Sequence, residues 1–371
     1  MLNNNLKKIM SLIFVVSMLF AAGTLVLAHA QASPDPKPTA TPTATPYTPP
    51  ANYIAQWGSV GSGNGQLNEP QGIAIAPNGN VYVVDALNYR VEEFEPNGNY
   101  ITQWGTQGTS GNGEFDQPWG IAVSPITGNV YVTEIAQGTN LVQEFTSSGS
   151  FITQWGQGSG SAALDLPYGI AIDSSGNVYV ADMGNSRVAV FTSSGTYITQ
   201  FGTAGTQPGD QQDPTGIAIS PFNGNVYVAD QGINDITEYT TSGTLVTTWG
   251  SFGHGNSQFD APLGLAIDSS GDVYVADWGN DRVQVFSSSG TYSGQWGSDG
   301  SGNGQFVNPT GVAVSPSNGN IYVTDTGNDR VQEFGTPSFV SPEYVYGALI
   351  ALASCFAAVA VLTVVRKRRH K

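Results

Sequence analysis

Residues 262–286 read P-L-G-L-A-I-D-S-S-G-D-V-Y-V-A-D-W-G-N-D-R-V-Q-V-F. Three short runs of apolar and β-branched residues, at 265–267, 273–276 and 283–286, have the composition of β-strands. The segments between them are rich in Gly, Ser, Asn and Asp, which favour tight turns because Gly tolerates positive φ and the others bond their own backbone. A fourth strand is expected to end at Trp296. The stretch therefore predicts a four-stranded unit.

This unit occurs six times along the chain. A P-x-G-[IVL]-A tag begins at Pro70, Pro118, Pro167, Pro214, Pro262 and Pro309. An acid, called here the closing acid, ends the second strand of each repeat: Asp85, Glu134, Asp182, Asp230, Asp277 and Asp325. A fixed period of about 48 residues with four short strands per repeat is typical of a propeller or a solenoid.

The two ends of the array favour a ring. The sixth repeat stops after its third strand, at Phe334, and an orphan strand at 53–57 precedes the first tag. If that strand completes the last repeat, both open sheet edges disappear, and open edges promote aggregation. We expect an all-β fold: a six-bladed β-propeller over residues 53–335, closed by the N-terminal strand, plus one C-terminal transmembrane helix.

The segments outside the repeats predict export and anchoring. Residues 1–30 resemble a signal peptide, with an uncleaved anchor as the alternative, and residues 31–52 form a Pro/Thr-rich linker. After a second linker at 336–343, residues 344–365 contain no charge and are long enough, at about 1.5 Å per residue, to cross a bilayer as a helix. The basic tail, 366–371, is expected to stay cytoplasmic. The propeller is therefore predicted at the cell surface, membrane-anchored and outside.

The charge of the repeats restricts the partners. Residues 51–340 carry four arginines, no lysine and 26 acids, a formal charge of about −22. Such a field repels nucleic acid and anionic lipid, so we expect no nucleic-acid partner. The alternative is that the acidic surface serves only to keep the protein soluble.

Those four arginines each follow a closing acid by five residues: Asp85/Arg90, Asp182/Arg187, Asp277/Arg282 and Asp325/Arg330. We interpret them as structural pairs that tie the second strand to the third strand or to the next blade. The alternative is an anion-binding set of four arginines.

Two repeats break this pattern. Leu141 stands opposite Glu134, and Asp235 stands opposite Asp230. Because calcium takes oxygen ligands, Asp230 and Asp235 are a candidate cation site, and calcium is the one cofactor that we consider. The alternative is drift at a tolerant position.

Loop lengths direct the search for a binding surface. Turns between first and second strands (77–80, 173–177, 268–272) and between third and fourth strands (193–196, 288–291) are short and define a short-loop face. Crossings between blades (58–69, 105–117, 250–261) are longer and define the opposite, long-loop face, where binding is expected. Candidate contact residues at the channel mouth there are Trp119, Ile135, Tyr168, Met183, Leu263 and Trp278. Packing of the channel rim is the alternative role.

The sequence of the repeats gives little support for a catalytic site. His254 is the one histidine of the repeats, so a three-histidine zinc site cannot form there. No Ser-His-Asp or Cys-His arrangement and no phosphate-binding glycine loop is visible, so catalytic residues are predicted as none.

The repeat P-x-G-I-A-[IV]-x-x-x-G-N-[VI]-Y-V-[AT]-D-x-x-N-x-R-V-x-x-F resembles the NHL repeat over about residues 53–335. The resemblance implies a six-bladed propeller that serves mostly as an interaction platform, with an amidating lyase as an enzymatic exception. The zinc histidines of that lyase have no counterpart here, and the basic face of RNA-binding members is absent.

The C-terminal segment also carries a resemblance. Pro342-Glu343-Tyr344, the apolar run and the basic tail resemble the sorting signals of prokaryotic surface proteins of the exosortase and archaeosortase classes, with a plain transmembrane anchor as the alternative. The predicted function is binding of a protein or glycan at the cell surface. The alternatives are an extracellular metal-dependent lyase or lactonase, and a structural surface-layer spacer.

Overall fold

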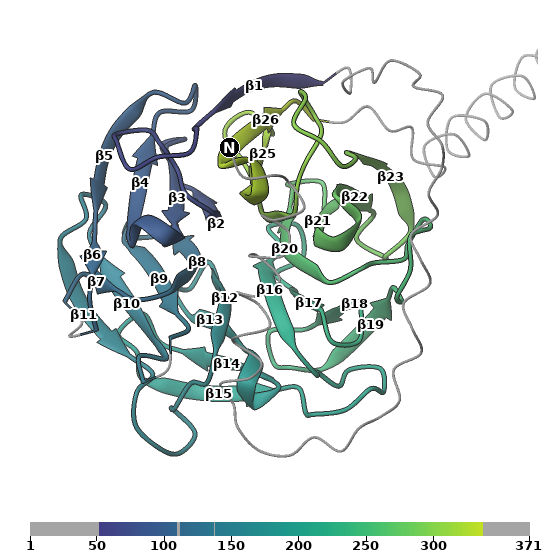
Figure 1. The fold of residues 1–371 in the computed structure, drawn as a ribbon. Helices are drawn as coiled ribbons and strands as arrows, with labels where there is room; N and C mark the ends of the chain where they lie inside the picture. Colours follow the sequence, from purple (N-terminus) through teal and green to yellow (C-terminus); the bar gives the residue numbers. More distant parts are fainter. Residues whose placement is uncertain (1–51, 110–111, 137, 337–371) are drawn as a thin grey trace, which may run out of the picture.

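The computed structural model describes residues 52–109, 112–136 and 138–336. They form six four-stranded antiparallel sheets arranged as blades around a central axis (Figure 1). The prediction of an all-β six-bladed propeller is confirmed.

The first three blades follow the chain order. Blade 1 consists of β2 (Pro70–Ile75), β3 (Val81–Asp85), β4 (Arg90–Phe94) and β5 (Tyr100–Trp104). Blade 2 consists of β8 (Pro118–Val123), β9 (Val130–Glu134), β10 (Leu141–Phe145) and β11 (Phe151–Trp155). Blade 3 consists of β12 (Pro167–Ile172), β13 (Val178–Asp182), β14 (Arg187–Phe191) and β15 (Tyr197–Phe201). Two short strands, β6 (Thr106–Gln107) and β7 (Glu114–Phe115), pair in the crossing between blades 1 and 2.

The last three blades complete the ring. Blade 4 consists of β16 (Pro214–Ile219), β17 (Val226–Asp230), β18 (Asp235–Tyr239) and β19 (Leu245–Trp249). Blade 5 consists of β20 (Pro262–Ile267), β21 (Val273–Asp277), β22 (Arg282–Phe286) and β23 (Tyr292–Trp296). Blade 6 consists of β24 (Pro309–Val314), β25 (Ile321–Asp325), β26 (Arg330–Phe334) and β1 (Tyr53–Trp57). Single 3₁₀ turns follow the second strand in blades 1, 3, 5 and 6: η1 (Ala86–Asn88), η2 (Met183–Asn185), η3 (Trp278–Asn280) and η4 (Thr326–Asn328).

Packing between blades supplies the core. The second and third strands are buried along their whole length because neighbouring blades cover both faces. One cluster joins Tyr227 and Ala229 of blade 4 to Val273 and Val275 of blade 5. The fourth strands lie outside and are only partly buried. This explains why the inner strands read as continuous apolar runs.

The ring closes through the N-terminal strand, as predicted. β1 pairs antiparallel with β26, with Gln56 opposite Gln332 and Trp57 opposite Val331 (Figure 1). Two further hydrogen bonds extend the pairing, because the Gly335 N–H donates to the Asn52 carbonyl at 2.7 Å and Asn52 Nδ2 donates to the Gly335 carbonyl at 2.8 Å. The outer edge of β26 is therefore paired, and blade 6 has four strands like the other blades.

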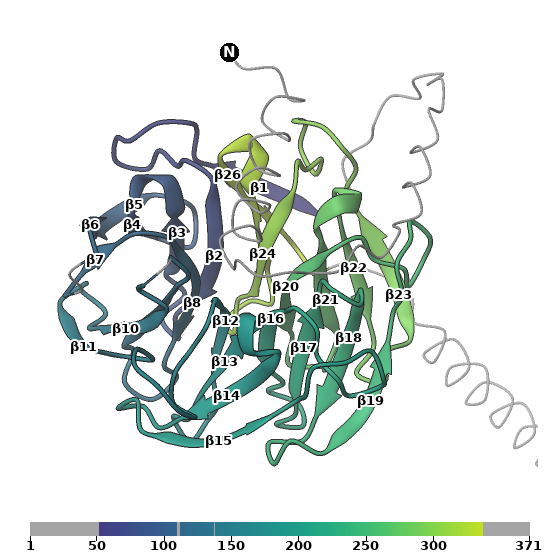
Figure 2. The same ribbon diagram turned by 60° about the horizontal axis from the view of Figure 1, so that its bottom comes forward.

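The innermost strands of the blades surround the central channel (Figure 2). A glycine in each of them lets neighbouring strands approach one another. A Cβ on Gly72 would lie 2.5 Å from the Trp119 carbonyl oxygen, and one on Gly311 would lie 2.7 Å from the Gln71 carbonyl oxygen. The same clash with the next blade recurs at Gly120, Gly169, Gly216 and Gly264. Glycine in the P-x-G tag is thus required by the close approach of backbones rather than by a turn.

The predicted signal peptide (1–30), the N-terminal linker up to residue 51, the transmembrane segment (344–365) and the basic tail (366–371) lie outside the described residues. Within the described part of the chain, no helix is long and apolar enough to cross a membrane.

Candidate functional site

The long-loop end of the central channel is largely filled. Ile135, Tyr168 and Met183 pack as one buried cluster, and Trp119 lies against it with its ring centroid 4.7 Å from that of Tyr168. Leu263 is also buried, whereas Trp119 and Trp278 are half-buried. The structure therefore places four of the six predicted contact residues in the packed wall, the arrangement expected from rim packing.

The channel itself is narrow. The space between the innermost strands has a volume of about 80 Å³ and is lined by the ring glycines with Trp119, Leu263 and residues at equivalent positions. Small-molecule pockets usually measure about 300–1,000 Å³, so this space is too small to enclose a typical ligand.

The four Asp–Arg pairs form buried salt bridges, with Nε to Oδ2 distances of 2.6–2.7 Å. Each guanidinium also donates to backbone carbonyls of the crossing that precedes its own blade. Arg330 donates to the Ser301, Gly302 and Gln305 carbonyls at 2.9–3.0 Å, and to Gln56 of β1 at 2.7 Å. With their N–H groups engaged in this way, the arginines clamp the crossings and are not arranged to capture an anion.

The closing acids anchor the same crossings from the other side. Asp325 Oδ1 accepts the Val307 N–H at 2.8 Å, and Asp277 Oδ1 accepts the Asp260 N–H at 2.8 Å. Burial raises the pKa of Asp277 and Asp325, while the hydrogen bonds and the paired arginine act in the opposite direction. These carboxylates belong to the architecture of the blade.

Blade 2 has no arginine opposite its closing acid, which is bound by neutral donors, including a glutamine that has equivalents in blades 5 and 6. Gln143 Nε2 donates to Glu134 Oε1 at 2.6 Å, and the Asp116 N–H donates to Glu134 Oε2 at 2.9 Å. Burial raises the pKa of Glu134 to about 7. Leu141, at the arginine position, is buried.

Blade 4 places two acids opposite each other, since Asp230 pairs with Asp235 in the ladder. Asp230 accepts backbone N–H groups from Gln212 at 2.6 Å and from Asp213, Gly232 and Ile233 at 2.9–3.2 Å. Asp235 is buried, and its Oδ1 has no hydrogen-bond partner. Burial and, second, the charge of Asp230 raise the pKa of Asp235 to about 7. Among the residues that the structure describes, no three His, Cys, Asp or Glu side chains lie close enough together to bind a metal ion.

The short-loop face contains a second repeated polar arrangement, which sequence reasoning missed. In blades 1, 2, 4 and 6 a buried second-strand tyrosine donates its hydroxyl to a third-strand glutamate at 2.7–3.0 Å. The pairs are Tyr82–Glu93, Tyr131–Glu144, Tyr227–Glu238 and Tyr322–Glu333. An asparagine at the end of the adjoining turn donates to the same glutamate oxygen at 2.6–2.7 Å.

In blades 3 and 5 this acid lies instead in the turn between the first and second strands. The glutamate position holds Val190 in blade 3, and Tyr179 donates instead to Asp173 in the first turn, at 3.3 Å. Blade 5 repeats the exchange with Val285, Tyr274 and Asp268, at 3.1 Å. Alignment of the six repeats would have revealed it, because the turn position holds Asp only where the third strand holds Val.

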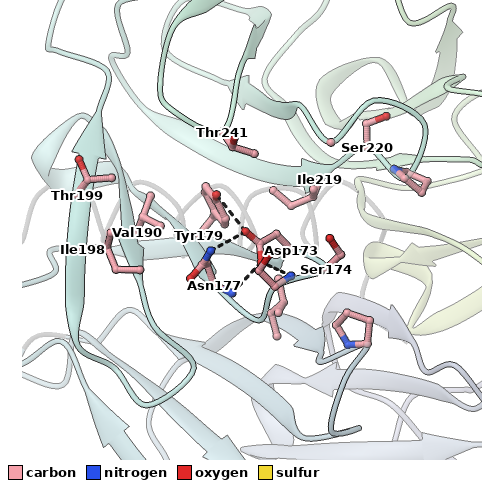
Figure 3. Close-up of a pocket in the computed structure, with 15 residues that line it drawn as sticks. Asp173, Ser174, Asn177, Tyr179, Val190, Ile198, Thr199, Ile219, Ser220 and Thr241 are labelled. Atoms are coloured by element: carbon pink, nitrogen blue, oxygen red, sulfur yellow. Dashed lines mark hydrogen bonds between the residues drawn. The ribbon is translucent and has the colours of Figure 1, made fainter.

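A pocket lies between blades 3 and 4, and the exchanged residues Asp173 and Val190 line it (Figure 3). It has a volume of about 750 Å³. Its polar lining includes Asp173, Ser174, Asn177, Thr199, Ser220 and Thr241, and its apolar lining includes Ile172, Val190, Ile198 and Ile219. The Tyr131 hydroxyl lies 3.3 Å from the Ser193 carbonyl of the next blade, and the equivalent residue opposite Tyr179 is Thr241, at the pocket wall.

Asp173 lines this pocket and is held by hydrogen bonds, which Figure 3 draws as dashed lines. Its Oδ1 accepts the N–H groups of Ser175 and Asn177 at 2.9 and 2.8 Å, and its Oδ2 accepts Asn177 Nδ2 at 2.8 Å. Burial raises the pKa of Tyr179 to about 12, so its hydroxyl remains a proton donor.

A second hollow of about 630 Å³ lies on the same face and borders Asp268, the other exchanged acid. Ile219 and Pro221 of blade 4 line both hollows. The turn after β16 therefore forms a ridge between them, and its Phe222 is 60% exposed.

The fold and these sites define a six-bladed propeller with pockets on its short-loop face. Four segments match the NHL repeat: residues 67–94, 164–191, 259–286 and 306–334. They are the four blades that carry the Asp–Arg pair, which supports the resemblance of the repeat.

Curated proteins match over about one third of the chain. Protein brain tumor of Drosophila melanogaster is 25% identical over 130 residues, 35% of this chain and 12% of that protein. The B-box type zinc finger protein ncl-1 of Caenorhabditis elegans is 35% identical over 130 residues, 35% of this chain and 15% of that protein. Peptidyl-glycine alpha-amidating monooxygenase of Mus musculus is 29% identical over 136 residues, 34% and 14% of the two chains. The matched part is thus a small fraction of each relative.

Solved structures match over most of the propeller. A streptogramin B lyase superposes with a TM-score of 0.53 at 16% identity, covering 77% of this chain and 88% of that one. A gluconolactonase of Xanthomonas campestris gives a TM-score of 0.57 at 15% identity, covering 73% and 88%. A protein of Bacteroides thetaiotaomicron gives 0.59 at 19% identity, covering 76% of both chains. At such identities the likeness shows the fold alone.

Proposed function

We propose that this propeller is a binding module that takes an uncharged glycan in the pocket between blades 3 and 4. The observation that carries the proposal is the pocket itself, whose volume of about 750 Å³ is in the range of small-ligand sites. Its lining combines hydroxyl, amide and carboxylate groups with aliphatic side chains. Sugars likewise combine hydroxyl groups with C–H surface.

The charge of the pocket supports an uncharged ligand. No lysine, arginine or histidine is among the residues that line it, and Asp173 is one of them. Anionic ligands would meet an unfavourable field from this carboxylate and from the acidic propeller around it. The same argument opposes nucleic acid as a partner.

The proposal includes display at the cell surface. It rests on the resemblance of residues 1–30 to a signal peptide, on the uncharged segment 344–365 and on the basic tail. A module held at the membrane by a C-terminal helix would meet glycans or proteins outside the cell. The reactions of the lyase and gluconolactonase neighbours are not part of the proposal, because that likeness is one of fold.

The test uses the purified full chain and a panel of neutral oligosaccharides, followed by calorimetric titration of any that bind. The double variant Asp173→Ser, Val190→Glu should weaken binding, because it gives blade 3 the serine and glutamate of blade 4 and places a longer side chain at the pocket wall. We expect the affinity to fall about tenfold or more, which corresponds to about 1.4 kcal/mol.

Asp235→Arg is the matched control, because residue 235 is not among the residues that line the pocket and four other blades carry arginine at its position. It should bind the oligosaccharide as the wild type does. No binding by the wild type to any member of the panel, or equal binding by the double variant, would contradict the proposal. Specific capture of a surface protein that the double variant still binds would favour a protein partner.

A further inference from the structure

Blade 4 differs from the other blades at three buried positions around its crossing, residues 203–213. Gln211 stands where the others have Leu67, Phe115, Leu164, Phe259 and Phe306. Tyr239 stands where the others have Phe94, Phe145, Phe191, Phe286 and Phe334. Asp235 stands where Arg90, Arg187, Arg282 and Arg330 lie. Each change introduces oxygen into a place that is apolar or cationic elsewhere.

The backbone of the blade 4 crossing keeps the geometry of the arginine blades. The Gln211 N–H donates to the Thr203 carbonyl at 2.8 Å, and the Asp210 N–H donates to the Gln207 carbonyl at 2.8 Å. In blade 6 the corresponding bonds join Phe306 to Ser298 at 3.0 Å and Gln305 to Gly302 at 3.1 Å. A parallel bridge also recurs, between Ala204 and Gln211 and between Asp299 and Phe306. Equivalent carbonyl groups therefore occupy equivalent places.

In blades 1, 5 and 6 three of those carbonyl groups accept the guanidinium, and in blade 3 the Ala163 carbonyl accepts it. The acceptors are Ser62, Gly63 and Gln66 in blade 1, His254, Gly255 and Gln258 in blade 5, and Ser301, Gly302 and Gln305 in blade 6. In blade 4 the corresponding residues are Thr206, Gln207 and Asp210. Asp235 cannot donate to them as arginine does, because an ionised carboxylate only accepts hydrogen bonds.

Two buried side-chain oxygens of blade 4 have no hydrogen-bond partner. They are Asp235 Oδ1 and Gln211 Oε1. Asp235 and Tyr239 lie on one face of β18, because alternate residues of a strand share a face. Gln211 Nε2 donates to the Tyr239 hydroxyl at 2.8 Å, so Gln211 packs against this face as well. Unpartnered buried acceptors are costly and call for a donor or a cation.

We propose that blade 4 binds a divalent cation of the calcium class between β18 and the crossing 203–213, in the place that a guanidinium occupies in four other blades. The side-chain ligands are Asp235 and Gln211, and the carbonyl groups of Thr206, Gln207 and Asp210 supply the remaining protein oxygens. Calcium accepts such a mixed set of six to eight carboxylate, amide and backbone oxygens. Because amide and backbone oxygens also bind calcium, a site with few carboxylates can hold this ion.

Asp230 is assigned an indirect role. Its oxygens already accept four backbone N–H groups, so it holds the crossing in place and contributes negative charge beside Asp235. The cation site stands independently of the glycan pocket, because none of its residues lines that pocket.

The test measures calcium bound to the full chain after treatment with chelator and equilibrium dialysis against CaCl₂. The wild type should bind about one equivalent more than Asp235→Arg and Asp235→Asn, and its thermal midpoint should rise with calcium more than theirs. Asp235→Arg is expected to fold, since it restores the residue of the sibling blades. Asp235→Asn keeps the side-chain volume and removes the charge.

Equal calcium binding by the wild type and both variants at millimolar CaCl₂ would overturn the proposal. So would a wild type whose midpoint responds to pH but not to calcium, because a proton on Asp235 would then satisfy the neighbouring carbonyls. Loss of calcium binding with retained oligosaccharide binding would separate this site from the proposed function.

Discussion

Blades 4 and 5 are neighbours with the same strand order and the same hydrogen bonds in their crossings, yet they hold buried polar groups differently. Blade 5 neutralises Asp277 with Arg282, whereas blade 4 sets Asp235 opposite Asp230. On the opposite face, blade 4 pairs Tyr227 with a third-strand glutamate, and blade 5 pairs Tyr274 with a turn aspartate. A propeller blade thus keeps its backbone while exchanging the groups that satisfy its buried polar atoms.

The largest effect is expected for Arg282→Asp, which gives blade 5 the charges of blade 4 and so tests the difference between the two blades. It removes a buried guanidinium that bonds Asp277, Gln295 and three carbonyl groups. We expect the free energy of unfolding to fall by about 3–5 kcal/mol, because a buried charge loses its partner. Urea denaturation measures this. Asp235→Arg should cause no comparable loss, and equal losses in both variants would show that the two blades do not differ in this way.

The junction between the two blades is tested by Gly216→Ala. A Cβ at Gly216 would collide with the carbonyl oxygen of Leu263 in the next blade. We expect a loss of about 1–3 kcal/mol in the free energy of unfolding, the usual cost of overpacking. Gly335→Ala is the control, since the nearest atom to its Cβ would be at 3.7 Å. A neutral Gly216→Ala would refute the close-approach argument for the ring.

The exchange of acids on the short-loop face is tested by a double-mutant cycle in blade 5. Asp268→Ser alone removes the partner of the Tyr274 hydroxyl and should cost about 1–3 kcal/mol. Adding Val285→Glu should restore most of that loss, because Glu238 satisfies Tyr227 from the same position in blade 4. Chemical denaturation of the four proteins gives the coupling energy. Additive effects would mean that the two arrangements are not equivalent.

The last expected effect is a pH dependence that belongs to blade 4. Burial raises the pKa of Asp235 from its ordinary 3.8 to about 7. In the absence of calcium, its contribution to stability is therefore full below pH 3.8, declines as the pH rises, and is lost above about pH 7. Asp235→Asn should flatten the fall of the thermal midpoint between pH 5 and 8. An unchanged slope would place the titration elsewhere, for example on Glu92 or Glu134, whose pKa values burial also raises to about 7.

The candidate site was harder to predict than the fold. Loop length directed attention to the long-loop face, but Ile135, Tyr168 and Met183 are buried there against one another. The largest pocket that we describe lies on the opposite face, beside Val190 and Asp173. Those two residues are 17 positions apart in the chain, and each looks ordinary until the six repeats are compared position by position. Pocket formation depends on which side chains share a junction, and loop lengths carry no information on that.

The sequence by itself determined the blade, the number of blades and the closure. Each of these follows from local signals, namely strand-forming runs, turn residues and a period, together with the need to satisfy the edge of the last sheet. Only the tertiary structure decided what the polar residues that recur among the repeats do. It showed that the arginines clamp the crossings, that Asp230 is satisfied by backbone N–H groups, and that Asp235 and Gln211 keep unpartnered oxygens. The arginines and Gln211 contact partners more than 20 residues away in the chain, and Asp230 binds a crossing 17–18 residues away, so these outcomes arise only when a strand and its crossing pack together.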